Sequence, residues 1–113
     1  MIKRTIDELK TYDPPGHFGM TAMRVHGKDE TGAQKFWVGL STFLPGGGAD
    51  WSLETLEKVY YILEGEMTVT EKSGKKHVLC KDDSFSMTEG DERRIVNESN
   101  IPARMLVIAS YPD

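Results

Sequence analysis

Lysine, arginine and tyrosine side chains occupy alternate positions in two segments of strand-like composition, where they could act together on a small molecule. Lys58 and Tyr60 stand two residues apart in the first segment, and Arg93 precedes Asn97 by four residues in the second. A guanidinium can hold a carboxylate through two parallel hydrogen bonds. A lysine amine can act as an acid, a base or an imine-forming nucleophile, and a phenol can donate a proton. Because side chains alternate across a strand, each pair projects from one face of its strand.

The elements that must position these residues are short strands separated by turns. Segment 6–12 could form a helical turn or an edge strand, residues 14–16 a turn, and residues 27–32 a polar hairpin loop. No stretch of useful length has helical periodicity, so the pattern predicts an all-β antiparallel sandwich or barrel. The predicted strands are 20–26, 35–44, 59–63, 66–70, 77–79, 85–87, 93–97 and 104–109.

Length, charge and cysteine content restrict the class of protein. The chain has 113 residues, enough for one domain, and a net charge of −4 without the clustered basic residues that nucleic-acid binding requires. No apolar run approaches the roughly 20 residues of a membrane span, and the first nine residues lack the apolar region of a signal peptide. The single cysteine, Cys80, excludes an internal disulfide and is typical of a reducing compartment, so we expect a cytoplasmic protein.

The stretch 45–66 resembles the first motif of cupin barrels. That motif runs from a glycine through a His-x-His loop to a glutamate and, after six intervening residues, to a second glycine. Counting back from Gly65 places Lys58 at the glutamate position. The two histidine positions fall on Trp51 and Leu53, or on Ser52 and Glu54 if the loop is one residue shorter.

The second cupin motif fits further along the chain without gaps. Gly90 and Asn97 match it, whereas Asp82, Thr88 and Arg93 stand where the family has a glycine, a proline and a metal-binding histidine. The resemblance covers residues 36–109 and implies a small single-domain cupin whose usual metal ligands are replaced. The implied fold is a double-stranded β-helix, or jelly-roll barrel, with an amino-terminal arm at 1–19 and the barrel at 20–109.

The basic side chains at ligand positions argue against a metal ion and predict no cofactor. A charged ammonium or guanidinium has no lone pair to donate and repels a divalent cation. His17, His26 and His77 lie outside the matched positions, and we expect them at the surface or at strand edges. A metal-dependent cupin that uses Glu54 or Glu57 as a rebuilt ligand is an alternative.

If Lys58 faces the barrel lumen as the family's glutamate does, it shares a partly apolar cavity with Arg93. Burying two unpaired cations is costly, so an anion must lie between them. That anion is either a ligand or an internal carboxylate, and the alternative without a ligand is a pocket filled by ion pairs alone. The internal candidates are Glu54, Glu57, Asp50 and Glu92. We expect Lys58 and Tyr60 to be catalytic and the ligand-binding residues to be Arg93, Trp51, Glu54, Asn97 and Trp37.

These expectations describe a metal-independent, small-molecule-binding cupin with a cationic pocket for an anionic, carboxylate-type metabolite. Its enzymatic form is a lyase, an isomerase or a decarboxylase, and a non-catalytic binding or regulatory module is the alternative. Single-domain cupins commonly dimerise, so the resemblance implies a homodimer. The apolar residues Ile2, Ile6 and Leu9 near the amino terminus also need a surface to pack against.

Overall fold

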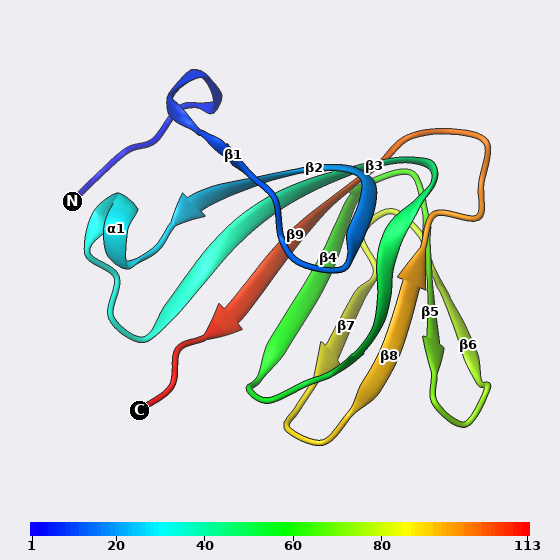
Figure 1. Cartoon of the computed structure of the whole chain (residues 1–113). Coiled ribbons are helices and arrows are strands. Elements are labelled where there is room, and N and C mark those ends of the chain that lie inside the picture. Colours follow the sequence, from blue (N-terminus) through cyan, green and yellow to red (C-terminus); the bar gives the residue numbers. More distant parts are fainter.

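Eight strands of the chain wrap into a nearly closed antiparallel barrel, and a ninth, very short strand lies on its edge (Figure 1). The structure is a computed structural model that describes all 113 residues. The prediction of an all-β antiparallel fold is confirmed. The elements in chain order are a 3-10 turn at Ile6–Glu8, β1 Thr11–Tyr12, β2 His17–His26, α1 Lys28–Thr31, β3 Phe36–Leu53, β4 Lys58–Glu64, β5 Met67–Glu71, β6 Lys76–Leu79, β7 Ser84–Met87, β8 Glu92–Val96 and β9 Ala103–Ser110.

The long strand β3 connects the two walls of the barrel. Its first half pairs with β2 and β9, and its second half pairs with β8. The strand order is β6-β5-β8-β3-β9-β4-β7, with β2 also paired to β3 and β1 to β2, so β6 and β7 are the two edges where the barrel stays open. Because Ser52 lies opposite Arg93, the end of β3 is held directly beside the basic residue of β8.

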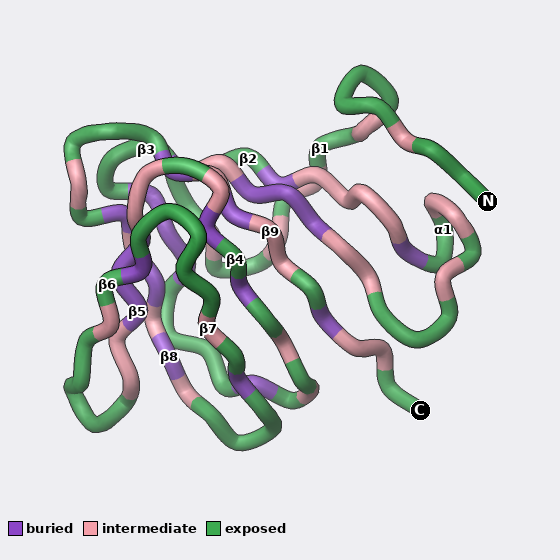
Figure 2. The backbone as a smooth tube through the Cα atoms, turned by 180° about the vertical axis from the view of Figure 1, so that it is seen from behind, coloured by how far each residue is buried: buried purple, intermediate pink, exposed green.

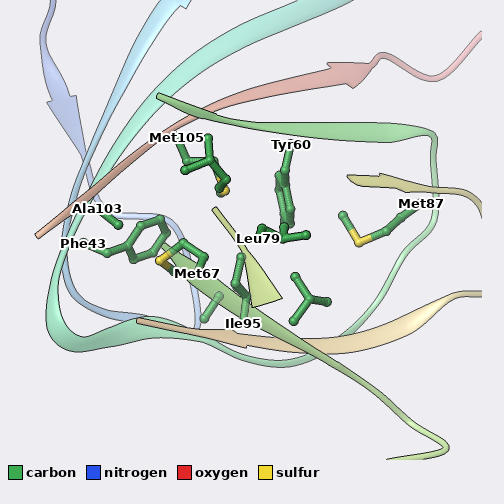
Figure 3. Close-up of a cluster of buried hydrophobic side chains, with 11 residues drawn as sticks. Phe43, Tyr60, Met67, Leu79, Met87, Ile95, Ala103 and Met105 are labelled. Atoms are coloured by element: carbon green, nitrogen blue, oxygen red, sulfur yellow. The ribbon is translucent and has the colours of Figure 1, made fainter. Parts of the chain in front are cut away.

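Strand alternation places the predicted inward-facing residues inside the barrel. On β4, Lys58 is partly buried and Tyr60 and Ile62 are almost fully buried, while the residues between them are more exposed. Buried positions alternate with more exposed ones along the inner strands (Figure 2). The packed core is shown in Figure 3 and consists of Phe43, Ala49, Tyr60, Ile62, Met67, Val69, Leu79, Met87, Ile95, Ala103 and Met105.

Two segments differ from the sequence prediction, and a third combines both of its predicted alternatives. Residues 45–53 continue β3 instead of forming a loop, because the glycines allow close contact between backbones: a Cβ at Gly47 or Gly48 would collide with the backbone of β2 or β8. Residues 28–31 form a short helix, closed by Gly32 with a positive φ of 75°, where a hairpin loop was predicted. Segment 6–12 contains both of its predicted alternatives, a 3-10 turn and an edge strand.

No helix of the chain has the length and apolar character needed to span a membrane.

Asn97 has a structural role rather than the ligand-binding one expected from the sequence. Its side chain is fully buried, and its amide nitrogen donates to the backbone oxygens of Phe43, at 3.3 Å, and Ile101, at 2.7 Å. Its side-chain oxygen accepts hydrogen bonds from the backbone nitrogen and the hydroxyl of Ser99, at 3.0 and 2.7 Å. Asn97 therefore ties the loop between β8 and β9 to β3 and has no donor left for a ligand.

The substitution Asn97→Ala is expected to lower the free energy of unfolding by about 2–4 kcal/mol, because it leaves buried backbone groups without their partners. Urea unfolding followed by circular dichroism measures the change. Asn100→Ala, at an exposed position three residues away, is the control and should stay within about 0.5 kcal/mol of wild type. Equal effects of the two substitutions would contradict the structural role.

Candidate functional site

A cavity of about 280 Å³ lies inside the barrel. One wall comes from residues 12–17, here called the strap, which runs from β1 into the start of β2. The other walls come from β2, β3, β4, β8 and β9, so residues far apart in the sequence meet there. Much of the lining is apolar, and the polar or ionisable side chains that line it are Tyr12, Asp13, His17, Arg24, Ser41, Lys58, Tyr60 and Arg93.

A buried carboxylate holds two basic side chains at one end of this cavity. The Glu54 carboxylate lies 3.1 Å from the ammonium nitrogen of Lys58 and 3.3 Å from a terminal guanidinium nitrogen of Arg93. The side chains of Glu54 and Arg93 are each only 5% exposed, and that of Lys58 is 22% exposed. We call these three residues the ion triad. Its carboxylate balances one of its two positive charges, so the triad carries a net charge of +1.

Glu54 is thus the internal anion among the four candidates named from the sequence. Asp50 contributes its backbone oxygen to Arg93 at 3.3 Å, but its carboxylate pairs with Arg94 at 3.6 Å. Glu92 pairs with Lys72 on the surface at 3.7 Å, and Glu57 forms no ion pair. The Nε atom of Arg93 is buried and has no hydrogen-bond partner, so the guanidinium retains an unused donor.

Tyr60 lies beside the ion triad as a protonated phenol. Burial raises its pKa above the usual value of 10, and the nearby Glu54 charge acts in the same direction, while the Arg93 guanidinium partly offsets both. Its hydroxyl is therefore neutral at physiological pH. Tyr60 can donate a hydrogen bond or a proton to a ligand in the cavity, but it does not act as a base there.

His17 is a cavity residue at the start of β2, where the sequence analysis expected only a surface or strand-edge histidine. Its Nδ1 lies 2.9 Å from the backbone oxygen of Pro15, and because a carbonyl oxygen only accepts, Nδ1 carries the proton. Burial lowers the pKa of His17 below 6.5, and the charges of Arg93 and Lys58 lower it further, against the opposing effect of the Pro15 hydrogen bond. His17 is therefore neutral at pH 7, with an unprotonated Nε2 that can serve as a base or an acceptor.

Arg24 and Trp37 form the side of the cavity next to the strap. Trp37, which the sequence analysis named as a ligand-binding candidate, lines the cavity. The guanidinium carbon of Arg24 lies 4.1 Å from the Trp37 ring centre and 4.9 Å from that of Tyr12. Arg24 was not identified from the sequence. The only available signal was its alternation with Ala22, which places both side chains on the same face of β2.

Trp51 does not line the cavity, contrary to the sequence expectation. It is 48% exposed and lies on β3 just past Ala49, where the pairing with β8 shifts register. The shift leaves residues 50–53 exposed and turns Glu54 inward.

The other two histidines make local contacts away from this cavity. His26 hydrogen-bonds the Thr31 hydroxyl at 3.2 Å. His77 lies 2.6 Å from Glu71 and packs against Phe85, and it lines a second hollow of about 360 Å³ on the far side of Arg93. That hollow lies between strands β5, β6, β7 and β8, where the barrel stays open.

The side chains around the ion triad do not fit a divalent metal ion. No group of three or more His, Cys, Asp or Glu side chains in the chain is placed to hold one. Glu54, the only buried carboxylate near the cavity, is already bound by two cations that would repel a metal. The chemistry of the cavity must therefore come from its own hydrogen-bond donors, its positive charge and the His17 imidazole.

Comparisons with known proteins agree on one family. The family model described as "Cupin domain" matches residues 39–109. A relative from Mycobacterium tuberculosis, named beta-D-galactosidase Rv1717, is 37% identical over 101 residues, which cover 89% of this chain and 86% of the relative.

Solved structures show the same fold at low identity. The polyketide cyclase RemF from Streptomyces resistomycificus matches with a TM-score of 0.85 and 22% identity, over 97% of this chain and 80% of its own. A sugar phosphate isomerase of the cupin superfamily from Silicibacter pomeroyi matches with a TM-score of 0.78 and 22% identity, over 98% of this chain and 76% of its own.

Removing the charge of Glu54 is expected to destabilise the protein, because Lys58 and Arg93 would then repel each other without a counter-ion. Glu54→Gln should lower the free energy of unfolding by about 3 kcal/mol, as measured by urea unfolding. Glu57→Gln, in the same loop but exposed and without an ion pair, should have little effect. Wild-type stability of Glu54→Gln would show that the triad does not need its carboxylate.

His17 is expected to titrate below pH 6.5 in the folded protein, because its charged form is buried next to two cations. Proton NMR of the imidazole resonances measures the midpoint, with His17→Gln used to assign the signal. Between this midpoint and pH 6.5 the unfolded chain binds the proton and the folded chain does not, so acidification through this range lowers stability. A folded midpoint at or above 6.5 would be inconsistent with the described burial.

Proposed function

The chain belongs to the cupin family, and we propose that its barrel cavity binds a small carboxylate-bearing metabolite without a metal ion. The observation that carries this proposal is the ion triad, in which two basic residues share the single buried carboxylate of Glu54. A ligand carboxylate would balance the remaining positive charge and could accept a hydrogen bond from the unused Nε of Arg93. The cavity volume of about 280 Å³ is at the lower end of ligand sites, which favours a small molecule.

The position of the ion triad in the cupin motifs supports a replaced metal site. In the shorter of the two loop alignments Glu54 takes a histidine position of the first motif, while Lys58 aligns with its glutamate and Arg93 with the histidine of the second motif. In this proposal the two cations take over the electrostatic task of a metal ion, which is to hold an anionic group of the substrate. Glu54 keeps their mutual repulsion low enough for the barrel to remain folded.

The same residues support acid–base catalysis on a substrate that is held by its carboxylate, as in an isomerase, a lyase or a decarboxylase. Arg93 and Lys58 would hold the carboxylate of the substrate. The unprotonated Nε2 of His17 would then accept a proton from the substrate, and the Tyr60 hydroxyl would donate a proton to another atom of the substrate. Lys58 then serves to bind and not as an imine-forming amine, since its ammonium is held by Glu54. A binding or regulatory module would use the same contacts without turnover.

Glycoside hydrolysis is a second candidate, favoured by the 37% identity to the relative named beta-D-galactosidase. Most glycosidases use two carboxyl groups on either side of the scissile bond. Among the cavity-lining residues only Asp13 has a carboxylate, and Glu54 lies behind Lys58 and Arg93. An assay with 4-nitrophenyl β-D-galactoside decides the question: turnover that Asp13→Asn abolishes supports hydrolysis, and no turnover removes this candidate.

We also propose the homodimer that the cupin resemblance implied. The outer face of β3, β9 and β4 carries Phe36, Ile108, Val59 and Tyr61, all of them exposed. Val59 lies opposite Ile108 in the sheet, and Ile108 opposite Val38, so these three apolar residues form a row across the three strands, with Phe36 and Tyr61 on neighbouring rows. A second copy covering this row would remove it from water.

Isothermal titration calorimetry with butyrate tests the main proposal. Wild type is expected to bind the acid, and Lys58→Met and Arg93→Lys should each weaken binding at least about tenfold by removing a charge or the bidentate geometry. Lys75→Met, on an exposed turn, is the matched control and should bind as wild type does. No binding by wild type, or unchanged binding in both cavity variants, would refute a carboxylate site at the triad.

A further inference from the structure

We propose that Arg24 is a second anion-binding group of this cavity, so that the natural ligand carries an acidic group at each end. The inference rests on the proposed carboxylate binding at the ion triad and narrows the ligand to small dianions. One end would be a carboxylate at Lys58 and Arg93. The other end would be a carboxylate or a phosphate at Arg24.

Arg24 has the geometry of a prepared anion receptor. It lines the cavity from β2, and its guanidinium packs against the rings of Trp37 and Tyr12, at 4.1 and 4.9 Å. Such stacking fixes the plane of the guanidinium and leaves its N–H groups free to donate along the edges. The packing therefore orients Arg24 before any ligand arrives.

The donors of Arg24 have no partner within the protein. No ion pair or side-chain hydrogen bond involves this residue, and its Nε is buried with no acceptor in reach. An unsatisfied buried donor is unfavourable, and a charged one more so. A bound carboxylate or phosphate would satisfy two N–H groups at once and remove this penalty.

Arg24 and the ion triad reach the cavity from different sides. Arg24 lies opposite Gly39 in the sheet, Gly39 opposite Val107, and Val107 opposite Tyr60. The strands β2 and β4 are therefore three strand spacings apart, roughly 14 Å along the curved wall. Arg93 comes from β8, on the opposite wall. Two anion-binding positions separated across the cavity match a short chain with an acid at each end better than a single acid.

Acidic residues near Arg24 do not already neutralise it. Asp13 is exposed on the strap, and Glu30, which has one carboxylate oxygen buried without a hydrogen-bond partner, lies with Arg24, Glu8 and Asp29 around a separate hollow. Neither comes within ion-pair distance of the guanidinium. The three cations Arg24, Lys58 and Arg93 outnumber the two carboxylates, the buried Glu54 and the exposed Asp13, so the cavity keeps a net positive charge.

Calorimetric titration with matched acids tests the inference. Glutarate and succinate are compared with valerate and butyrate, which have the same chain lengths but a single acid, and 2-phosphoglycolate provides the phosphate arm. All titrations are made at one ionic strength. Wild type is expected to bind the better dianion at least about tenfold more tightly than its matched monoacid, as a new charge-assisted hydrogen-bonded pair implies.

Arg24→Gln should abolish this preference, so that each diacid binds no more tightly than its matched monoacid. Arg24→Lys keeps the charge but loses the planar pair of donors, so it should retain part of the preference. Arg104→Gln, at a partly exposed arginine that pairs with Glu64, is the control and should change neither affinity. Circular dichroism establishes that each variant is folded.

The outcomes separate this inference from the function on which it rests. Binding of monoacids with no preference for any dianion, or a preference that survives Arg24→Gln, overturns the role of Arg24 and leaves carboxylate binding at the triad intact. Failure of wild type to bind any of the acids overturns both. If 2-phosphoglycolate alone shows the preference, the group at Arg24 is a phosphate.

Discussion

The buried carboxylate of Glu54 is the constraint on which the rest of the site depends. It lies within 3.3 Å of both Lys58 and Arg93, and without it two cations would face each other inside a small barrel. Removing one charge from such a buried set of ion pairs lowers the free energy of unfolding far more than losing a surface ion pair does. Because one carboxylate serves two cations, the arrangement is stable enough to fold and still retains positive charge for a ligand.

The fold brings these groups together through a single long strand. β3 pairs with β9 in its first half and with β8 in its second, and its register shift after Ala49 turns Glu54 inward beside Arg93. The glycines at 47 and 48 let neighbouring backbones approach where side chains would collide. The anion-binding cavity is therefore a consequence of how β3 crosses between the two walls.

Short strand-like segments separated by turns were enough to predict the all-β fold, and the cupin resemblance combined with strand alternation predicted the inward positions of Lys58, Tyr60 and Arg93. The sequence named Glu54 only as one of four candidate counter-ions. It could not choose among them, because local spacing does not show which carboxylate a register shift turns inward. The same shift explains why Trp51 was misplaced.

His17 and Arg24 were missed because their approach to the cavity depends on the pairing of β2 with β3, a contact between residues far apart in the chain. Asn97 was identified as an inward residue, but its hydrogen-bond partners arise only when the β8–β9 loop closes over it.

The most direct test of this account is an X-ray structure of crystals grown or soaked with glutarate, examined with anomalous scattering for metals. The account predicts density for a carboxylate between Lys58 and Arg93, with Glu54 bridging the two basic side chains and no anomalous peak nearby. A metal ion coordinated by Glu54 and His17, with Lys58 and Arg93 turned out toward solvent, would contradict it.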